Sequence, residues 1–269
     1  MIDNLTVAPV SVVIPCYRCS GTIERALASV AAQTHRPAEV LLVDDGSNDD
    51  TLGVLKALER QYSEWVRVLS LPFNKGPSAA RNVGWNAATQ PYIAFLDADD
   101  VWHPEKIRIQ RKYMSLHKDV AACGHHCPYA ASAFNAPIVS DTEPTASVIS
   151  PVSLLFRNPF STPTVMLKKD LPVRFTGGHF FAEDLRLWQQ LAFAGYKTVR
   201  LEIALAYILK HPYGDGGLSA RLWAMEKGEL DNLLFLKQQR KIGAGLLSVS
   251  ILFSLLKYVR RLIVCKIFR

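Results

Sequence analysis

The sequence predicts an α/β fold, in which a mostly parallel sheet flanked by helices is followed by an amphipathic helical tail. Over the first hundred residues, short apolar runs typical of buried strands alternate with helical periodicity, and this alternation indicates βαβ units. Acidic or glycine-centred clusters follow the apolar runs, at the sheet edge where open α/β folds bind ligands. The 269 residues, 49% of them hydrophobic, are enough for one large or two small domains.

The first hundred residues supply most of this alternation. Apolar runs predict four buried strands, at residues 10–15, 40–43, 66–69 and 92–96. Helical periodicity predicts three helices between them, at residues 20–33, 51–62 and 78–88. In the first of these helices Ile23, Leu27 and Val30 fall on one face, as expected of a helix that packs on a sheet.

Beyond residue 102 the alternation weakens. A proline opens a predicted helix at residues 104–117, and a second helix is predicted at 182–194. Strands are predicted at residues 163–167 and 204–209. Residues 128–160 are rich in Ala, Ser and Pro and give little periodic signal, so the pattern defines fewer elements in this half.

The positive charge of the chain is concentrated in its tail. The formal net charge is +7, and residues 237–269 hold eight Lys or Arg and no acidic residue. The rest of the chain holds 23 basic and 24 acidic residues and is close to neutral. This distribution argues against nucleic acid as a partner and favours a localised electrostatic role for the C-terminus.

The tail is predicted to be helical from about Trp223. Residues 242–256 carry no charge, but they fall short of the about 20 apolar residues that a spanning helix needs. One polar stripe follows the helical spacing, through Ser250, Ser254, Lys257 and Arg261. This pattern is typical of a basic helix lying in a membrane interface, and a spanning helix or packing against the body or another subunit are the alternatives.

The most informative segment is the acidic loop after the strand at 92–96, which holds Asp97, Asp99 and Asp100. Carboxylates crowded at a strand end repel one another unless a cation lies between them, and hard divalent cations prefer oxygen ligands. The loop therefore suggests a metal that holds a phosphorylated ligand. An acidic turn that caps the next helix is the alternative.

Taken together, the motifs resemble those of family 2 glycosyltransferases with the GT-A fold, a Rossmann-like, mostly parallel sheet flanked by helices. The matching segments lie in family order and at family spacing between residues 10 and about 220. They are 11–17 (SVVIPCY), 43–47 (VDDGS), 80–82 (ARN), 95–100 (FLDADD) and 183–188 (EDLRLW). Each segment alone is a weak signal, and the set is specific.

The resemblance implies that the strand ends of the first half bind a nucleotide. Pro15, Tyr17 and Glu24 would hold the nucleobase and ribose, and Asp44 would accept a hydrogen bond from the uracil imide. Asp97 would face the ribose. Asp99 would bind Mg²⁺ or Mn²⁺, which would bridge the diphosphate oxygens.

Further donor contacts are implied on the neighbouring loops. Asp45 stands beside Asp44, although an ordinary turn also favours its Asp-Gly sequence. The loop at 74–82 is hinged at Gly76 and enters a helix, whose backbone amides favour anions. Arg81 on this helix would reach the base or a phosphate. His211 matches a segment that closes over the diphosphate, as a metal or phosphate ligand.

The pair Glu183-Asp184 is expected to carry the chemistry. Inverting sugar transfer requires a base that takes the proton from an acceptor hydroxyl as this attacks the anomeric carbon, and a carboxylate does this well. By the resemblance the base is Asp184, with Glu183 in acceptor binding or structure. The alternative is that both acids only stabilise the N-terminus of the helix at 182–194.

The resemblance thus implies an inverting, metal-dependent glycosyltransferase. It would move a sugar from a nucleotide diphosphate sugar, UDP-linked, to a hydroxyl of a saccharide or lipid-linked acceptor in bacterial cell-surface polysaccharide biosynthesis. Residues 1–105 would bind the nucleotide sugar, 106–225 would bind the acceptor and carry catalysis, and 226–269 would be a basic amphipathic, membrane-associating tail. The expected location is peripheral, on the cytoplasmic face of the plasma membrane.

Other classes of protein fit the sequence less well. A metal-dependent nucleotidyltransferase would need a glycine-rich signature near the first strand, and a non-catalytic, transferase-derived membrane scaffold would have lost Asp99 or Asp184. The five cysteines, odd in number, indicate no disulfide framework and fit a reducing cytoplasm. Residues 123–127 (CGHHC) lack the second ligand pair of a zinc site and are expected to lie at a strand edge.

Overall fold

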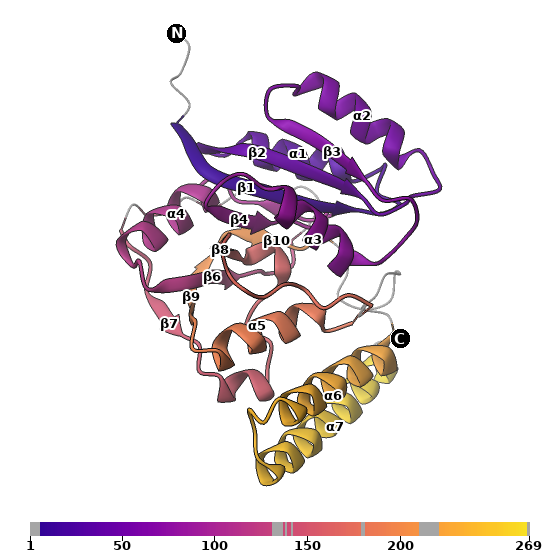
Figure 1. The fold of residues 1–269 in the computed structure, drawn as a ribbon, viewed down its shortest axis with the longest axis vertical. Helices are drawn as coiled ribbons and strands as arrows, with labels where there is room; N and C mark the ends of the chain where they lie inside the picture. Colours follow the sequence, from indigo (N-terminus) through magenta and orange to yellow (C-terminus); the bar gives the residue numbers. More distant parts are fainter. Residues whose placement is uncertain are drawn as a thin grey trace.

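The computed structural model of the chain shows a central sheet with helices on both faces and a separate pair of helices at one end (Figure 1). It describes residues 6–130, 137, 139–140, 142–178, 181–209 and 221–267. The predicted α/β architecture with a helical tail is confirmed.

One sheet of eight strands runs through both halves of the chain, in the order β3-β2-β1-β4-β8-β6-β9-β7. The first four strands in this order are parallel, β8 is antiparallel to both of its neighbours, and β6 pairs with β9 in parallel. The strands are β1 (Thr6–Cys16), β2 (His35–Asp44), β3 (Val66–Ser70), β4 (Tyr92–Phe95), β6 (Val120–His126), β7 (Ala146–Val148), β8 (Met166–Lys168) and β9 (Lys197–Ala204). A small second sheet pairs β5 (Val101–Trp102) with β10 (Ala206–Tyr207).

Helices cover both faces of the sheet, which explains why its central strands are apolar on both sides. Successive residues of a strand point to opposite faces, so Val12 and Ile14 of β1 join one core cluster and Val13 joins the other. The first cluster includes residues of α1 (Ile23–Ala31), α2 (Thr51–Gln61) and α4 (Lys106–Leu116). The second includes residues of α3 (Pro77–Ala87) and α5 (Glu183–Phe193).

The elements of the first half lie where the sequence predicts them, within a few residues at each end. Residues 123–127, expected at a strand edge, include the C-terminal end of β6, which stops at His126. Two predictions of the second half need correction. At 163–167 a 3₁₀ turn (Thr162–Thr164) precedes the strand, which starts only at Met166. The strand expected at 204–209 is β10, which is shorter, at Ala206–Tyr207. The strand β9, at Lys197–Ala204, is missing from the prediction because its alternating polar residues do not form an apolar run.

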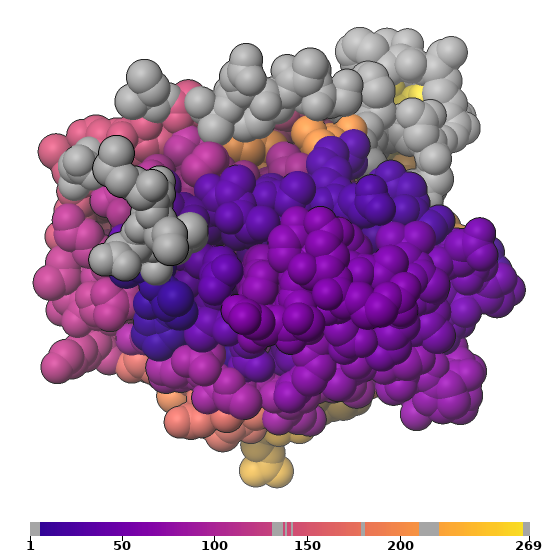
Figure 2. Space-filling model, turned by 90° about the horizontal axis from the view of Figure 1, so that it is seen from above, coloured from indigo at the N-terminus to yellow at the C-terminus, as the bar shows by residue number. Residues whose placement is uncertain are grey.

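The tail is helical, as predicted, and forms a hairpin of α6 (Leu222–Gln238) and α7 (Ala244–Ile267). The hairpin lies at the end of the molecule away from α1 and α2 (Figure 1), and the view from the opposite end shows mainly the N-terminal half (Figure 2). Within the described residues, no helix has the length and apolar character needed to cross a membrane. The polar stripe of α7 faces α6, where Ser250 and Ser254 are buried.

Two glycines provide a test of this packing. Gly84 of α3 lies against β1 so closely that an added Cβ would stand 2.4 Å from Cγ1 of Val13, whereas Gly53 of α2 has open space around it. We expect Gly84→Ala to lower the free energy of unfolding by about 1–3 kcal/mol through overpacking. Gly53→Ala should raise it by roughly 0.5–1 kcal/mol through helix propensity. Urea unfolding measures both, and equal changes in the two variants would contradict the α3–β1 contact.

Candidate active site

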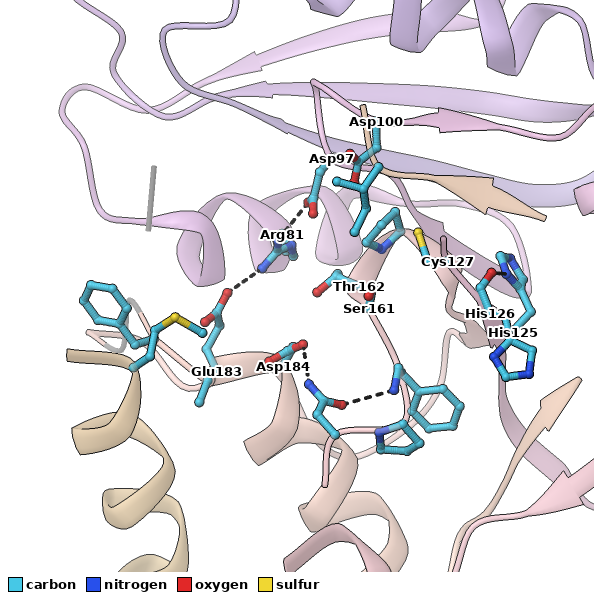
Figure 3. A pocket seen from close by; sticks show the side chains of 18 residues that line it. Arg81, Asp97, Asp100, His125, His126, Cys127, Ser161, Thr162, Glu183 and Asp184 are labelled. Atoms are coloured by element: carbon cyan, nitrogen blue, oxygen red, sulfur yellow. Dashed lines mark hydrogen bonds and ion pairs between the residues drawn. The ribbon is translucent and has the colours of Figure 1, made fainter. Parts of the chain in front are cut away.

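A cavity of about 500 Å³ opens where the C-terminal ends of the parallel strands meet the N-terminus of α5 (Figure 3). Carboxylates from both halves of the chain face it, and the figure shows Asp97 and Asp184 on opposite sides. Its lining residues are Arg81, Asp97, Asp100, His125, His126, Cys127, Asn158, Pro159, Phe160, Ser161, Thr162, Pro163, Phe181, Ala182, Glu183, Asp184, Ile208 and Met225. The cavity therefore joins the two predicted halves of the site.

Strand register brings the predicted nucleotide-binding residues to one edge of the sheet. Cys16 of β1 is opposite Asp44 of β2, so Pro15 and Tyr17 stand beside the acidic end of β2. On the other side of β1, Val13 is opposite Phe95, and Asp97 follows two residues later. Tyr17 is exposed and available for contact. Glu24 lies nearby in sequence, exposed in the first turn of α1.

The two acids after β2 are buried and engaged with neighbouring loops. Asp45 accepts hydrogen bonds from the backbone amides of Lys75 and Gly76, both at 2.8 Å. Burial raises the pKa of Asp45, and these two amides oppose the rise. Asp44 accepts from the Ser47 amide and the Ser70 hydroxyl. The backbone amides of this loop thus bind the carboxylate of Asp45, an anion of the protein itself. A contact between Gly76 and a phosphate of the donor stays a prediction.

Arg81 joins the two halves of the site. Its guanidinium donates to Asp97 through Nη2 and to Glu183 through Nη1, each at 2.9 Å, and only 6% of its side chain is exposed. Burial alone lowers the pKa of Arg81, but the two carboxylates outweigh it and leave that pKa above its ordinary value. The guanidinium also lies over the ring of Phe175, 5.3 Å from its centroid. A contact between Arg81 and the base or a phosphate of the donor stays a prediction.

Asp184, the predicted base, lines the cavity with both carboxylate oxygens hydrogen-bonded. Its Oδ1 accepts from the Leu185 amide at 2.7 Å, and its Oδ2 accepts from Nδ2 of Asn158 at 2.9 Å. The amide of Phe160 donates to Oδ1 of Asn158 and so fixes the orientation of that side chain. Burial, with the charge of Glu183, raises the pKa of Asp184 to about 7. A carboxylate with this pKa exchanges protons near neutrality.

The tail hairpin supports the start of the acidic helix. Ala182, which precedes Glu183, has a left-handed backbone with φ +52°. Asn232 of α6 donates to the Ala182 carbonyl at 2.7 Å and accepts from Nε of Arg186 at 2.6 Å. Gly228 lies so close to the Phe181 carbonyl that an added Cβ would be 2.5 Å from its oxygen. These α6 contacts stabilise an unfavourable backbone conformation next to the candidate base.

Of the acids in the loop after β4, Asp97 and Asp100 line the cavity and Asp99 does not. Asp100 is buried against the cavity; burial, with the charge of Asp97, raises its pKa to about 8. Asp99 is half-buried outside the lining, and its carbonyl accepts from Arg25 at 3.1 Å. Among the described residues, no three or more His, Cys, Asp or Glu are grouped to hold a metal. Mg²⁺ sites commonly use one or two carboxylates plus substrate phosphates, so the oxygen donors of this loop fit such an ion.

Sequence reasoning missed several residues of this site. Asn158 and Thr162 line the cavity from the segment with little periodic signal, and no motif marks them. Asn232 lies in the tail, where only the helical pattern was visible. His211 lies outside the described residues. Glu183, predicted beside Asp184, does line the cavity, and so does Asp100, which the sequence showed only as a member of the acidic loop.

The sheet order and the carboxylates at its strand ends define a protein of the GT-A fold. The sequence pattern described as Glycosyl transferase family 2 matches residues 11–184. The chain therefore belongs to glycosyl transferase family 2, as its motifs indicate.

Relatives by sequence carry related names. The chain is 26% identical over 240 residues to the putative teichuronic acid biosynthesis glycosyltransferase TuaG of Bacillus subtilis, covering 85% of this chain and 90% of TuaG. It is 28% identical over 204 residues to the UDP-Glc:alpha-D-GlcNAc-diphosphoundecaprenol beta-1,3-glucosyltransferase WfaP of Escherichia coli, covering 75% of this chain and 77% of WfaP. It is 40% identical over 118 residues to the uncharacterized glycosyltransferase alr2836 of Nostoc, covering 44% of this chain and spanning only 36% of that relative.

Solved structures share the fold at low sequence identity. The mannosyltransferase PcManGT from Pyrobaculum calidifontis, in complex with GDP-Man and Mn²⁺, has a TM-score of 0.68 and 17% identity, over 91% of this chain and 69% of that one. S. aureus TarS 1–349 in complex with UDP-GlcNAc has a TM-score of 0.61 and 21% identity, over 84% of this chain and 66% of that one. The GT-A assignment rests on this likeness and on the sheet order.

The bridge through Arg81 predicts a large effect on stability. We expect Arg81→Met to lower the free energy of unfolding by about 3–5 kcal/mol, because it leaves the buried Glu183 carboxylate without its cation. Arg60→Met, at an exposed position of α2, is the matched control and should change it by less than about 0.5 kcal/mol. Urea unfolding measures both variants. A loss at Arg81 no larger than that of the control would mean that the bridge contributes little.

Proposed function

We propose that this protein is an inverting glycosyltransferase that moves a sugar from a UDP-linked donor to a hydroxyl of a saccharide or lipid-linked acceptor. The observation that carries the proposal is one cavity, in which Asp97 at the donor edge of the sheet faces Asp184 at the start of α5 (Figure 3). Membership of glycosyl transferase family 2 and the similar fold of S. aureus TarS, solved in complex with UDP-GlcNAc, support a nucleotide-sugar donor.

The nucleotide would lie along the edge formed by Tyr17, Asp44 and Asp97. Its sugar would then extend into the cavity toward Asp184. The Asp184 carboxylate would take the proton of the acceptor hydroxyl while that oxygen bonds to the anomeric carbon and the bond to the leaving diphosphate breaks. Attack from the side opposite the leaving group inverts the configuration. Asn158 and the Leu185 amide hold Asp184 in one orientation during this step.

A divalent ion, Mg²⁺ or Mn²⁺, fits the donor edge. Asp99 would hold it together with the diphosphate, and the Asp97 carboxylate would add negative charge beside it. When bound, such an ion neutralises charge on the leaving nucleoside diphosphate. The PcManGT structure, in complex with GDP-Man and Mn²⁺, supports metal use in this fold.

A lipid-linked acceptor is supported by the similarity to WfaP, a glucosyltransferase named for its alpha-D-GlcNAc-diphosphoundecaprenol acceptor. An acceptor of this kind requires the enzyme to work at a membrane surface. We place it on the cytoplasmic face of the plasma membrane, as a peripheral protein in cell-surface polysaccharide synthesis.

The assignment of the base can be tested by pH. A base must be unprotonated to act, so kcat/KM should rise with pH through about 7, the pKa of Asp184, and level off above it. Asp184→Asn should lower kcat by about 10²–10⁴ and leave UDP affinity unchanged. Asp170→Asn, an exposed acid outside the cavity, is the control. Near-normal turnover of Asp184→Asn would assign the base to another residue.

The metal assignment can be tested by calorimetry with UDP, with and without Mn²⁺. Wild type should bind UDP more tightly with Mn²⁺, and Asp99→Ala should remove most of that gain, because the carboxylate that shares the ion is lost. Asp119→Ala, whose side chain is 64% exposed and paired with Lys197, should retain the gain. The same Mn²⁺ dependence in Asp99→Ala and wild type would exclude Asp99 as a ligand.

A further inference from the structure

One face of α7 is apolar and exposed over about four turns of the helix. Val249, Leu252, Leu256, Val259 and Ile263 follow one another at intervals of three or four residues, and so lie on one side of the helix. Their exposed fractions lie between 50% and 61%. Leu255, Leu262 and Phe253 flank this row and are also exposed. A soluble surface rarely leaves such a continuous apolar row in water.

The polar face of α7 is turned inward instead. Ser254 donates to Glu226 at 2.7 Å, and Glu229 forms ion pairs with Lys257 and Arg261, each at 2.8 Å. Burial alone raises the pKa of Glu229, but these two cations outweigh it and lower the pKa below its ordinary value. The acids of α6 thus pair with Ser254, Lys257 and Arg261, three of the four residues of the polar stripe of α7. This pairing fixes the rotation of α7 and leaves its apolar row facing outward.

The surroundings of the row are basic. Lys237, Arg240 and Lys241 are exposed at the turn between the two helices, and Arg260 is exposed beside the row. Residues 237–269 contain no acidic residue. A symmetric contact between two copies through this face would bring like charges together. A partner with an apolar interior and an anionic surface complements the apolar row and its basic surroundings better than a second copy does.

We propose that the outward face of α7, the row from Val249 to Ile263, lies on a bilayer of anionic lipids and inserts its apolar side chains at the level of the acyl chains. Lys237, Arg240, Lys241 and Arg260 would contact the headgroups. The helix lies in the interface plane, and its length of 24 residues is compatible with this position. Trp223, which packs edge-on against Tyr258, would mark the headgroup level.

The hairpin connects this surface to the catalytic helix. Asn232 of α6 holds the Ala182 carbonyl next to Glu183-Asp184, and Met225 of α6 lines the cavity. A membrane bound along α7 would therefore hold the cavity in a fixed relation to the bilayer. The importance of this fixed position rests on the proposed function, because it matters only if the acceptor is lipid-linked. The proposed membrane binding does not depend on that function.

Co-sedimentation of the full chain with vesicles tests the surface without any nucleotide sugar. The probes are vesicles of phosphatidylcholine alone and of phosphatidylcholine with phosphatidylglycerol. Wild type should bind the anionic vesicles, and more weakly at high salt. Leu252→Gln/Leu256→Gln should bind on the order of a hundredfold more weakly, since two leucine side chains leave the interface. Leu116→Gln/Val148→Gln, at positions 60% and 65% exposed elsewhere, should bind like wild type.

A second variant tests the charges alone. Lys237→Gln/Arg240→Gln/Lys241→Gln should lose on the order of a hundredfold on anionic vesicles and little on neutral ones. Wild type that stays in the supernatant, or equal binding by the α7 and control variants, would overturn the proposal. So would a wild-type dimer that α7 variants convert to monomer without vesicle binding. UDP affinity is measured on each variant, so that a failure of donor binding is distinguished from a failure at the membrane.

Discussion

The guanidinium of Arg81 connects parts of the chain that are far apart in sequence: α3 on which it lies, Asp97 after β4, and Glu183 at the start of α5. Arg81 and Glu183 are buried here beside the partly exposed Asp97, and burial of either charge alone would be costly. The bridge sets the distance between the donor edge of the sheet and the helix that carries Asp184. The cavity exists between these two elements, so its shape depends on this contact.

The same principle recurs in the tail. Glu229 of α6 is largely enclosed and is stabilised by Lys257 and Arg261 of α7. Without these cations, burial of the Glu229 carboxylate would cost free energy. Without Glu229, the polar stripe of α7 would face the solvent instead of α6. Ion pairing thus decides which side of α7 is exposed. In turn α6, held by α7, contacts the strained backbone at Ala182 through Asn232.

Two acids, Asp184 in the cavity and Asp45 after β2, show how environment separates similar groups. Asp184 has a pKa near 7 because it is buried beside Glu183, while a single amide side chain and one backbone amide oppose the rise. Asp45 is also buried, but both of its oxygens accept backbone amides and it holds a loop in place. Under the proposed mechanism, identical side chains serve proton transfer in one place and loop structure in the other. The difference is that Asp184 lines the cavity and Asp45 does not.

The sequence by itself determined the strands of the first half, the order of the acidic motifs and the helical tail, because these depend on local periodicity and on residues adjacent in the chain. Only the tertiary structure decided that Arg81 bridges Asp97 and Glu183, that Asn158 orients Asp184, and where β9 begins. These depend on contacts between distant segments, which no local pattern encodes. The same is true of α7: its periodicity gave two faces, and the acids of α6 decided which one is exposed.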